Sequence, residues 1–302
     1  MNNLVIDGSN LLWRAHWVAS TRDQLVNTKG EWTGPVYLFL KSLKSLSDKF
    51  RPDSVWVTWD KRLNYPSTNF RKLAAPETYK QNRDTEKTIK VHEQHEKLSE
   101  YLTALGIKQI YPWVLEADDI ISWLCREKLT NSTIVTVDKD LLQLVNADTQ
   151  YYNPIKKKLI TINTFEQDVG IRVEKFVMYK ALLGDKSDNI EGIQGYGIQR
   201  STKLVESGNY DVVVNALNED DKNKFDKNIE LVNLFGSYHK EEGEVECYEK
   251  QYKELSELKP NMKKFEQLCL DAEFHSLIKD MDKWKQSFSR NSSLSSLISQ
   301  LI

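Results

Sequence analysis

The chain of 302 residues has only three cysteines, and they lie far apart at Cys125, Cys247 and Cys269. No two of them share the CxxC spacing of a zinc site or a redox pair, and an odd, dispersed set does not make a disulfide framework. The five histidines are scattered too, so the nitrogen and sulfur ligand sets that softer metals prefer are missing. We therefore expect reduced, structural thiols and no zinc centre.

Glycine and proline are also scarce, with 12 and 7 residues, and no run reaches the ~18 consecutive apolar residues of a membrane helix. This composition excludes collagen-like, low-complexity and membrane-spanning classes. The first residues, MNNLVIDGSN, lack the basic and then apolar order of a signal peptide. With 40% apolar residues the chain can bury a core. We expect a soluble monomer, cytoplasmic in location.

Four short segments rich in aliphatic, β-branched or aromatic residues alternate with stretches of helical spacing. They span residues 4–6, 54–59, about 108–111 and 133–137. Strands that alternate with helices predict a mostly parallel central sheet with helices on both faces. We expect this α/β core over residues 1–152. A largely helical region should follow over 153–302, with KKKLITI as a strand or one arm of a hairpin and a helix that stops at Gly184.

Residues 61–97 interrupt this alternation, because they are polar and have few periodic apolar positions. The segment is instead rich in basic residues, namely Lys61, Arg62, Arg71, Lys72, Lys80, Arg83, Lys87, Lys90 and Lys97. We expect an exposed, basic insertion.

Three of the predicted strands lead into an aspartate, at Asp7, Asp60 and Asp138. The carboxyl ends of parallel strands lie at one edge of a sheet, so these side chains should converge there. Six further acids open or follow neighbouring helices: Glu116, Asp118, Asp119, Asp140, Asp185 and Asp188. One aspartate at a helix start is often only a cap. Nine acids in such positions predict a single acidic site.

Clustered carboxylates repel one another and are costly to bury unless cations neutralise them. With oxygen ligands alone, the fitting ions are hard divalent cations, Mg²⁺ or Mn²⁺. Two such ions about 3.5–4 Å apart can activate a water and stabilise the leaving oxygen of a phosphodiester. The expected reaction is metal-dependent phosphodiester hydrolysis.

The formal net charge of −2 would by itself argue against a nucleic-acid partner. Without the nine acids proposed as ligands, however, the remainder of the chain carries +7. The surface outside the acidic site is thus net basic, which suits a polyanionic substrate.

Seven motifs follow one another between residue 3 and about residue 215: VIDGSN, VTWD, ETYKQNR, EADD, TVDKD, GDKSDNI and GIQGYGIQRSTKLV. In identity and order they resemble the structure-specific 5′ nuclease family. That family comprises flap endonucleases, the 5′-nuclease domains of bacterial DNA polymerases and stand-alone phage enzymes with 5′→3′ exonuclease, flap endonuclease and RNase H activity. The resemblance implies the parallel-sheet core described above.

The resemblance also implies roles for the acids. The first metal would be held, directly or through water, by Asp7, Asp60, Glu116, Asp118 and Asp138 or Asp140. The second metal would lie toward Asp119, Asp140, Asp185 and Asp188.

In this family the insertion after the second strand forms a helical arch for the 5′ single strand, which implies an arch over residues 61–97. Lys80 and Arg83 would then clamp the scissile phosphate and stabilise its developing charge, while Tyr79 would stack on a base. The alternative interpretation is a set of solvated helix charges.

The turn at about residues 190–205 resembles the helix-turn-helix with which the family grips duplex DNA. Gly192, Gly195 and Gly197 would let the backbone approach phosphates, and a monovalent cation such as K⁺ would bind carbonyl oxygens there. Arg200 and Lys203 would add phosphate contacts. Taken alone, the turn could equally be a tight loop.

The resemblance predicts an Mg²⁺-dependent 5′ nuclease that acts in replication on DNA and on RNA primers paired to DNA, at 5′ ends and flaps. If the chain is phage-encoded, as the resemblance implies, it would act in the cytoplasm of a bacterial host. Two alternatives stay open: a PIN-like ribonuclease with the same carboxylate chemistry, and a catalytically inactive junction-binding protein. We expect residues after about 215 to buttress the core. The Ser/Leu segment from Asn291 would be disordered or dock a sliding clamp or single-strand-binding protein.

Overall fold

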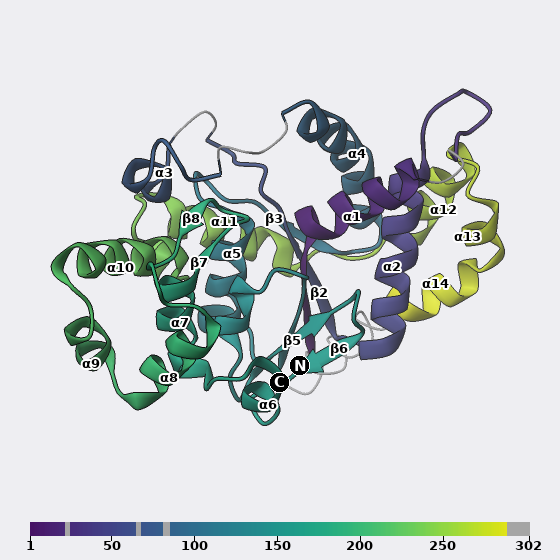
Figure 1. The fold of residues 1–302 in the computed structure, drawn as a ribbon. Helices are drawn as coiled ribbons and strands as arrows, with labels where there is room; N and C mark the ends of the chain where they lie inside the picture. The colour runs from purple at the N-terminus through teal and green to yellow at the C-terminus, as the bar shows by residue number, and fades with distance from the viewer. Residues whose placement is uncertain (22–24, 65–67, 81–84, 289–302) are drawn as a thin grey trace.

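The computed structural model of the chain describes residues 1–21, 25–64, 68–80 and 85–288 (Figure 1). Its centre is a six-stranded sheet in the order β3-β2-β1-β4-β5-β6. All neighbouring strands are parallel except β6, which runs antiparallel to β5. The mostly parallel sheet predicted from the sequence is therefore confirmed. The strands are β1 (Asn3–Asp7), β2 (Ser54–Thr58), β3 (Lys108–Ile110), β4 (Ser132–Val135), β5 (Thr149–Asn153) and β6 (Lys158–Ile160).

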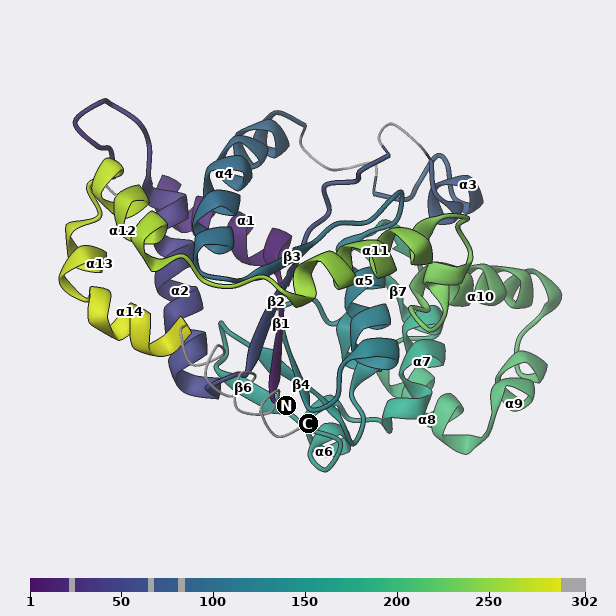
Figure 2. The same ribbon diagram turned by 180° about the vertical axis from the view of Figure 1, so that it is seen from behind.

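Both faces of the sheet are covered, which explains why its inner strands are apolar without alternation. In β1, Leu4 and Ile6 face one apolar cluster and Val5 faces another, and all three are fully buried. The first cluster contains α1 (Gly8–Ser20), α2 (Gly34–Phe50) and α4 (Thr85–Ala104). The second contains α5 (Ala117–Trp123) and α11 (Glu244–Ser256), on the other side of the sheet (Figures 1 and 2).

A third apolar cluster lies beside this core and is built from four helices around a small hairpin. Ile193, Val205, Val213 and Phe225 are among its buried residues. The elements are α7 (Phe176–Leu183), β7 (Gly184–Asp185), β8 (Ile190–Glu191), α8 (Ile198–Ser207), α9 (Tyr210–Asn215) and α10 (Glu219–Val232). The helix predicted to stop at Gly184 is α7, and that glycine follows its last residue with a positive φ of 72°.

Short elements make the remaining connections. They are α3 (Phe70–Ala74), a π-helical turn (Leu124–Lys128), 3₁₀ turns at Asp140–Leu144, Val173–Lys175 and Ser237–His239, and α6 (Phe165–Val169). In the part of the chain that the structure describes, no helix is long and apolar enough to cross a membrane. Cys125, Cys247 and Cys269 are free thiols, as expected.

The last helices return to the first half of the chain. Phe265 of α12 (Met262–Asp271) and Trp284 of α14 (Met281–Phe288) are buried in the same cluster as Leu4, with α13 (His275–Lys279) between them. The region after residue 215 therefore buttresses the core, as predicted. The sheet itself runs on to Ile160, so the predicted boundary at 152 falls inside β5.

The expectation of an exposed insertion over residues 61–97 is corrected in part. Arg71 is 2% exposed and Tyr79 is 4% exposed, and Val91 of α4 is buried in the main core. Burial of the basic side chain is possible because a carboxylate pairs with it, as described below. Residues 65–67 and 81–84, with Arg83 among them, lie outside the described residues.

Because α14 buries Trp284 in the main core, we expect the loss of this side chain to destabilise the fold strongly. Trp284→Ala should lower the free energy of unfolding by about 3–5 kcal/mol, because a fully buried indole is lost and a cavity is left. Lys285→Ala on the same helix removes one half-exposed ion pair with Glu266 and should cost less than about 1 kcal/mol. Urea unfolding followed by circular dichroism measures both, and equal losses would contradict the buttress.

Candidate active site

The parallel sheet brings three of the predicted acids to its carboxyl edge. Asp7 is the last residue of β1, Asp60 follows β2 by two residues, and Asp138 follows β4 by three. Asp118 reaches the same edge from the first turn of α5. These four acids, called the acidic cluster below, come from four separate elements.

Asp7 is tied down at this edge by two donors. The backbone N–H of Asn10 donates to Oδ1 at 2.9 Å, and the Thr136 hydroxyl donates to Oδ2 at 2.9 Å. Burial nevertheless raises the pKa of Asp7 to about 7, and the charges of Asp60 and Asp138 add to the effect. The carboxylates therefore lie close enough to repel one another.

Asp118 shows the same convergence. Burial first, and then the charges of Asp138, Asp7 and Asp60, hold the pKa of Asp118 well above its usual range, with Lys80 opposing them. Asp118 therefore lies close enough to Asp138, Asp7 and Asp60 for their charges to act on it.

Glu116 lies at the rim of the acidic cluster and collects donors from the insertion. Its Oε2 accepts from the Tyr79 hydroxyl at 2.9 Å and from the Lys80 ammonium at 2.7 Å. Arg62 lies 3.6 Å from Oε1. Lys80 also lies 3.5 Å from Asp188, so one ammonium connects two acids that are 72 residues apart in the sequence.

A second acidic group surrounds Lys180. Its ammonium is 2.6 Å from Asp140 Oδ1 and also pairs with Asp185. Burial raises the pKa of Asp140 to about 7 despite this cation. Burial alone would raise the pKa of Asp185 as well, but hydrogen bonds from Lys180 and Ser187 hold it below its usual range. Lys180 was missed from the sequence, although its place in the last turn of α7, just before GDKSD, was a usable signal.

Asp119, predicted to lie toward a second metal, is placed differently. It is fully buried, and Arg71 holds both its oxygens, with contacts of 2.7 Å and 2.8 Å. Ser237 donates to Oδ1 as well, and the N–H of Glu116 donates to Oδ2 at 3.2 Å. The structure therefore joins Asp119 to the insertion and not to the acidic cluster, because a buried guanidinium occupies its lone pairs.

Tyr79, predicted to stack on a base, is also placed differently. Its ring lies in the third apolar cluster at 4% exposure, and its hydroxyl donates to Glu116. A buried ring with a satisfied hydroxyl has no face to offer a nucleobase, so the stacking expectation is wrong here. The neighbouring Lys80 has a positive φ of 53°, and its ammonium lies near Glu116 and Asp188.

The donor set fits hard divalent cations, because every nearby ligand atom is an oxygen. Over the described residues, no three Asp, Glu, His or Cys side chains stand around one point in a ready coordination arrangement. Lys80 and Lys180 lie among the carboxylates instead and supply part of the missing positive charge. Cations that replaced these contacts would offset the burial and the repulsion that together raise the pKa values of Asp7 and Asp118.

The glycines of the predicted duplex-binding turn differ from one another. A Cβ on Gly192 would come within 2.3 Å of the Leu183 carbonyl, so this glycine permits close packing of the hairpin on α7. Gly195 has a φ of 80°, and Gly197, which precedes α8, has open space around it. Arg200 is exposed and stacks over Tyr196 at 4.0 Å, and Lys203 is exposed on the same helix.

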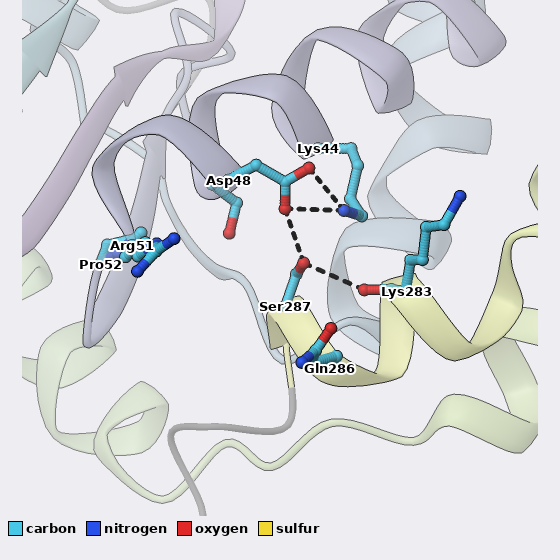
Figure 3. A pocket seen from close by; sticks show the side chains of 8 residues that line it. Lys44, Asp48, Arg51, Pro52, Lys283, Gln286 and Ser287 are labelled. Atoms are coloured by element: carbon cyan, nitrogen blue, oxygen red, sulfur yellow. Dashed lines mark hydrogen bonds and ion pairs between the residues drawn. The ribbon is translucent and has the colours of Figure 1, made fainter.

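A cavity of about 350 Å³ lies elsewhere, between the end of α2 and α14 (Figure 3). Lys44 and Ser287 both donate to Asp48 there, and Arg51 lines the same cavity. Arg51 comes three residues before β2 begins, so the cavity is at the amino end of the sheet. It shares no residue with the acidic cluster.

Comparison with known proteins identifies the family of this chain. The model of the 5′-3′ exonuclease N-terminal resolvase-like domain matches residues 2–170. This chain belongs to the 5′-3′ exonuclease family. Its members are hydrolytic, structure-specific nucleases. The 5′-3′ exonuclease of Aquifex aeolicus is 28% identical over 92% of this chain and 94% of its own length. That of Bacillus subtilis is 33% identical over 68% of this chain and 71% of its own.

Solved structures share the fold of this exonuclease-family chain. The T5 D15 protein co-crystallised with metal ions aligns with a TM-score of 0.66 and 20% identity, over 85% of this chain and 99% of its own. Flap endonuclease-1 from Methanococcus jannaschii aligns with a TM-score of 0.57 and 18% identity, over 95% of this chain and 92% of its own.

The different surroundings of two acids predict opposite effects on stability. Asp119→Asn should lower the free energy of unfolding by about 3 kcal/mol or more, because the buried Arg71 loses the carboxylate that accepts two hydrogen bonds from it. Asp138→Asn should leave the metal-free protein as stable or more stable, because it removes one of several repelling charges. Urea unfolding in EDTA compares them, and a stable Asp119→Asn protein would contradict the anchor role.

Proposed function

We propose that this chain is an Mg²⁺-dependent, structure-specific 5′ nuclease that cuts phosphodiesters at 5′ ends and 5′ flaps. The observation that carries the proposal is the acidic cluster, in which Asp7, Asp60, Asp118 and Asp138 meet at one sheet edge. Burial and the charges of the neighbouring acids raise the pKa values of Asp7 and Asp118 there. Oxygen ligands that are only partly neutralised by lysines attract divalent cations, which would offset the remaining repulsion.

The first cation would be held by the acidic cluster together with Glu116. The second would lie toward Asp138, Asp140, Asp185 and Asp188. When bound, such a pair supplies an activated water and stabilises the leaving oxygen. Asp119 takes no part as a ligand in this proposal, since Arg71 and Ser237 occupy it.

Lys80 is proposed to bind the scissile phosphate and stabilise its developing negative charge. Its ammonium already lies in the site, on Glu116 and near Asp188. Cations on these carboxylates would compete with that ion pair and leave the ammonium to bind the phosphate. Arg83 is proposed for the same task, and the arch is proposed to guide the 5′ strand. Lys180 is a further candidate for a phosphate contact, because Asp140 and Asp185 would be taken by the second cation.

The duplex is proposed to lie against the start of α8. Gly195 and Gly197 would let phosphates approach the backbone, a K⁺ ion would bind carbonyl oxygens of this turn, and Arg200 and Lys203 would contact the flanking phosphates. The exposure of all four residues supports this surface. A structural relative, the T5 D15 flap endonuclease, forms a pseudo-enzyme-product complex with DNA and metal ions.

The proposed substrates are DNA, and RNA primers paired to DNA, which implies RNase H activity and a place in DNA replication. A sliding clamp or a single-strand-binding protein would dock on the Ser/Leu segment from Asn291, which lies outside the described residues.

Cleavage of one labelled 5′-flap duplex tests the proposal. With Mg²⁺ the protein should release the flap, and with EDTA it should not. Asp138→Asn should lower turnover by about 10³-fold or more while duplex affinity stays within about tenfold, because a ligand is lost and the binding surface is not. Preference for single-stranded RNA would favour the PIN-like ribonuclease, and binding without any cleavage would favour the inactive junction-binding protein.

Metal binding should release protons near neutral pH. The pKa values of Asp7 and Asp140 are raised to about 7, so in metal-free protein each is partly protonated at pH 7 and must ionise to bind a cation. Calorimetric titration of Mg²⁺ in two buffers of different ionisation enthalpy should show release on the order of one proton. Equal heats of Mg²⁺ binding in the two buffers would contradict the proposal that these carboxyl groups ionise to bind the cations.

The raised pKa of Asp7 also makes the stability of the metal-free protein depend on pH. A carboxyl with a raised pKa stabilises the fold below its unfolded pKa, and this contribution is lost as pH rises through about 7. EDTA-treated protein should therefore melt at a lower temperature at pH 8 than at pH 6. Added Mg²⁺ should reduce this difference in melting temperature.

A further inference from the structure

A turn in the C-terminal half of the chain contacts both the loop that precedes α5 and the first turn of α5. We propose that this turn, Ser237–Glu244 and hereafter the clamp turn, sets the position of Glu116 and Asp118, with Glu244 as its main positioning residue. The clamp turn lies outside residues 2–170, which the family model matches. The proposal rests on the proposed function, since it concerns the affinity of that site for cations.

Glu244 is fully buried at the start of α11, and its carboxylate binds backbone. Oε1 accepts the N–H of Trp113 at 2.8 Å, and Oε2 accepts those of Val114 at 2.9 Å and Leu115 at 3.2 Å. These three amides belong to the loop that connects β3 to α5, and the residue that follows them is Glu116. In Figure 2, α11 lies alongside the end of β3 and α5.

A buried carboxylate with three amide donors fixes the loop strongly. If the loop moved by an ångström or more, the charge would lose hydrogen bonds in a place that water does not reach, which is costly. The carbonyls of the same loop are held too: Arg62 donates to Leu115 O at 3.0 Å, and Asn69 donates to Val114 O at 3.3 Å. Both polar sides of the loop are therefore satisfied in one position.

Two more residues of the clamp turn reach the same region. Ser237 donates to Asp119, the first-turn acid of α5 that Arg71 also holds. Glu241 accepts the backbone N–H of Phe70 at the start of α3. Farther along α11, the Gln251 side chain bonds both the N–H and the carbonyl of Tyr111, at 2.9 Å and 2.8 Å. The start of α5 and the base of the insertion thus share one support.

The consequence concerns metal binding. Two divalent cations require their carboxylates to be held within about half an ångström of a set arrangement. The loop that delivers Glu116 and Asp118 has no strand or helix of its own between Tyr111 and Glu116. Its position is given by Glu244, so weakening that carboxylate should weaken cation binding without removing a ligand.

The test uses Glu244→Gln, which keeps the shape of the side chain and removes its charge and one acceptor. Glu246→Gln is the matched control, because Glu246 is exposed on the same helix and no hydrogen bond or ion pair holds it among the residues described. Mn²⁺ binding without substrate is measured by electron paramagnetic resonance. Deuterium uptake of the peptide covering residues 111–117 is measured by mass spectrometry.

We expect Glu244→Gln to bind Mn²⁺ about tenfold more weakly and to take up deuterium faster at 111–117. Flap cleavage should return to within about threefold of wild type at saturating Mn²⁺, because every ligand is still present. Glu246→Gln should match wild type in all three measurements. Faster exchange with unchanged Mn²⁺ affinity would overturn the positioning role, and so would unchanged exchange. Wild-type protein that binds no Mn²⁺ would overturn the proposed function itself.

If circular dichroism shows that Glu244→Gln is unfolded, Gln251→Ala takes its place. This change removes the two hydrogen bonds at Tyr111 and leaves the buried charge in place. Mn²⁺ affinity should fall about two- to threefold with faster exchange at 111–117. An affinity equal to wild type in a protein whose loop exchanges faster would overturn the proposal.

Discussion

Repulsion between carboxylates is the constraint on which this structure depends. A parallel sheet delivers Asp7, Asp60 and Asp138 to one edge, and α5 adds Asp118, where burial and mutual charge make full ionisation costly. The chain answers with two lysines, Lys80 from the insertion and Lys180 from α7. The sheet, the insertion and the helical half therefore all place charged side chains in this region. Divalent cations bound there would offset the remaining repulsion.

Contacts across long stretches of sequence hold these acids in place. Arg71 binds Asp119 across 48 residues, and Glu244 binds the loop before Glu116 from about 130 residues away. Both are buried charges that are fully hydrogen-bonded, so they define one arrangement more strictly than apolar packing would. Elements from distant parts of the sequence thereby set the spacing of these carboxylates.

The sequence predicted the strands and the acids, because both follow local rules. A buried strand of a parallel sheet reads as an apolar run, and an aspartate after it lies at the carboxyl edge. The partner of Asp119 and the environment of Tyr79 could not be predicted in this way. Arg71 looks like any of nine basic residues in a polar segment, and only the tertiary fold shows which one is buried. Glu244 gave no local signal, since its partners are backbone amides.

The packing of α12 on α4 and of α14 on α2 has a consequence for synthesis on the ribosome. Leu40 and Leu43 of α2 share their cluster with Phe265, Trp284 and Phe288, which emerge more than 200 residues later. A nascent chain can pair β1 with β2 early, yet the apolar surface of α2 and α4 stays uncovered until α12–α14 have left the exit tunnel. Chaperone binding during translation is the natural protection for such a face, and prematurely terminated chains would be prone to aggregate.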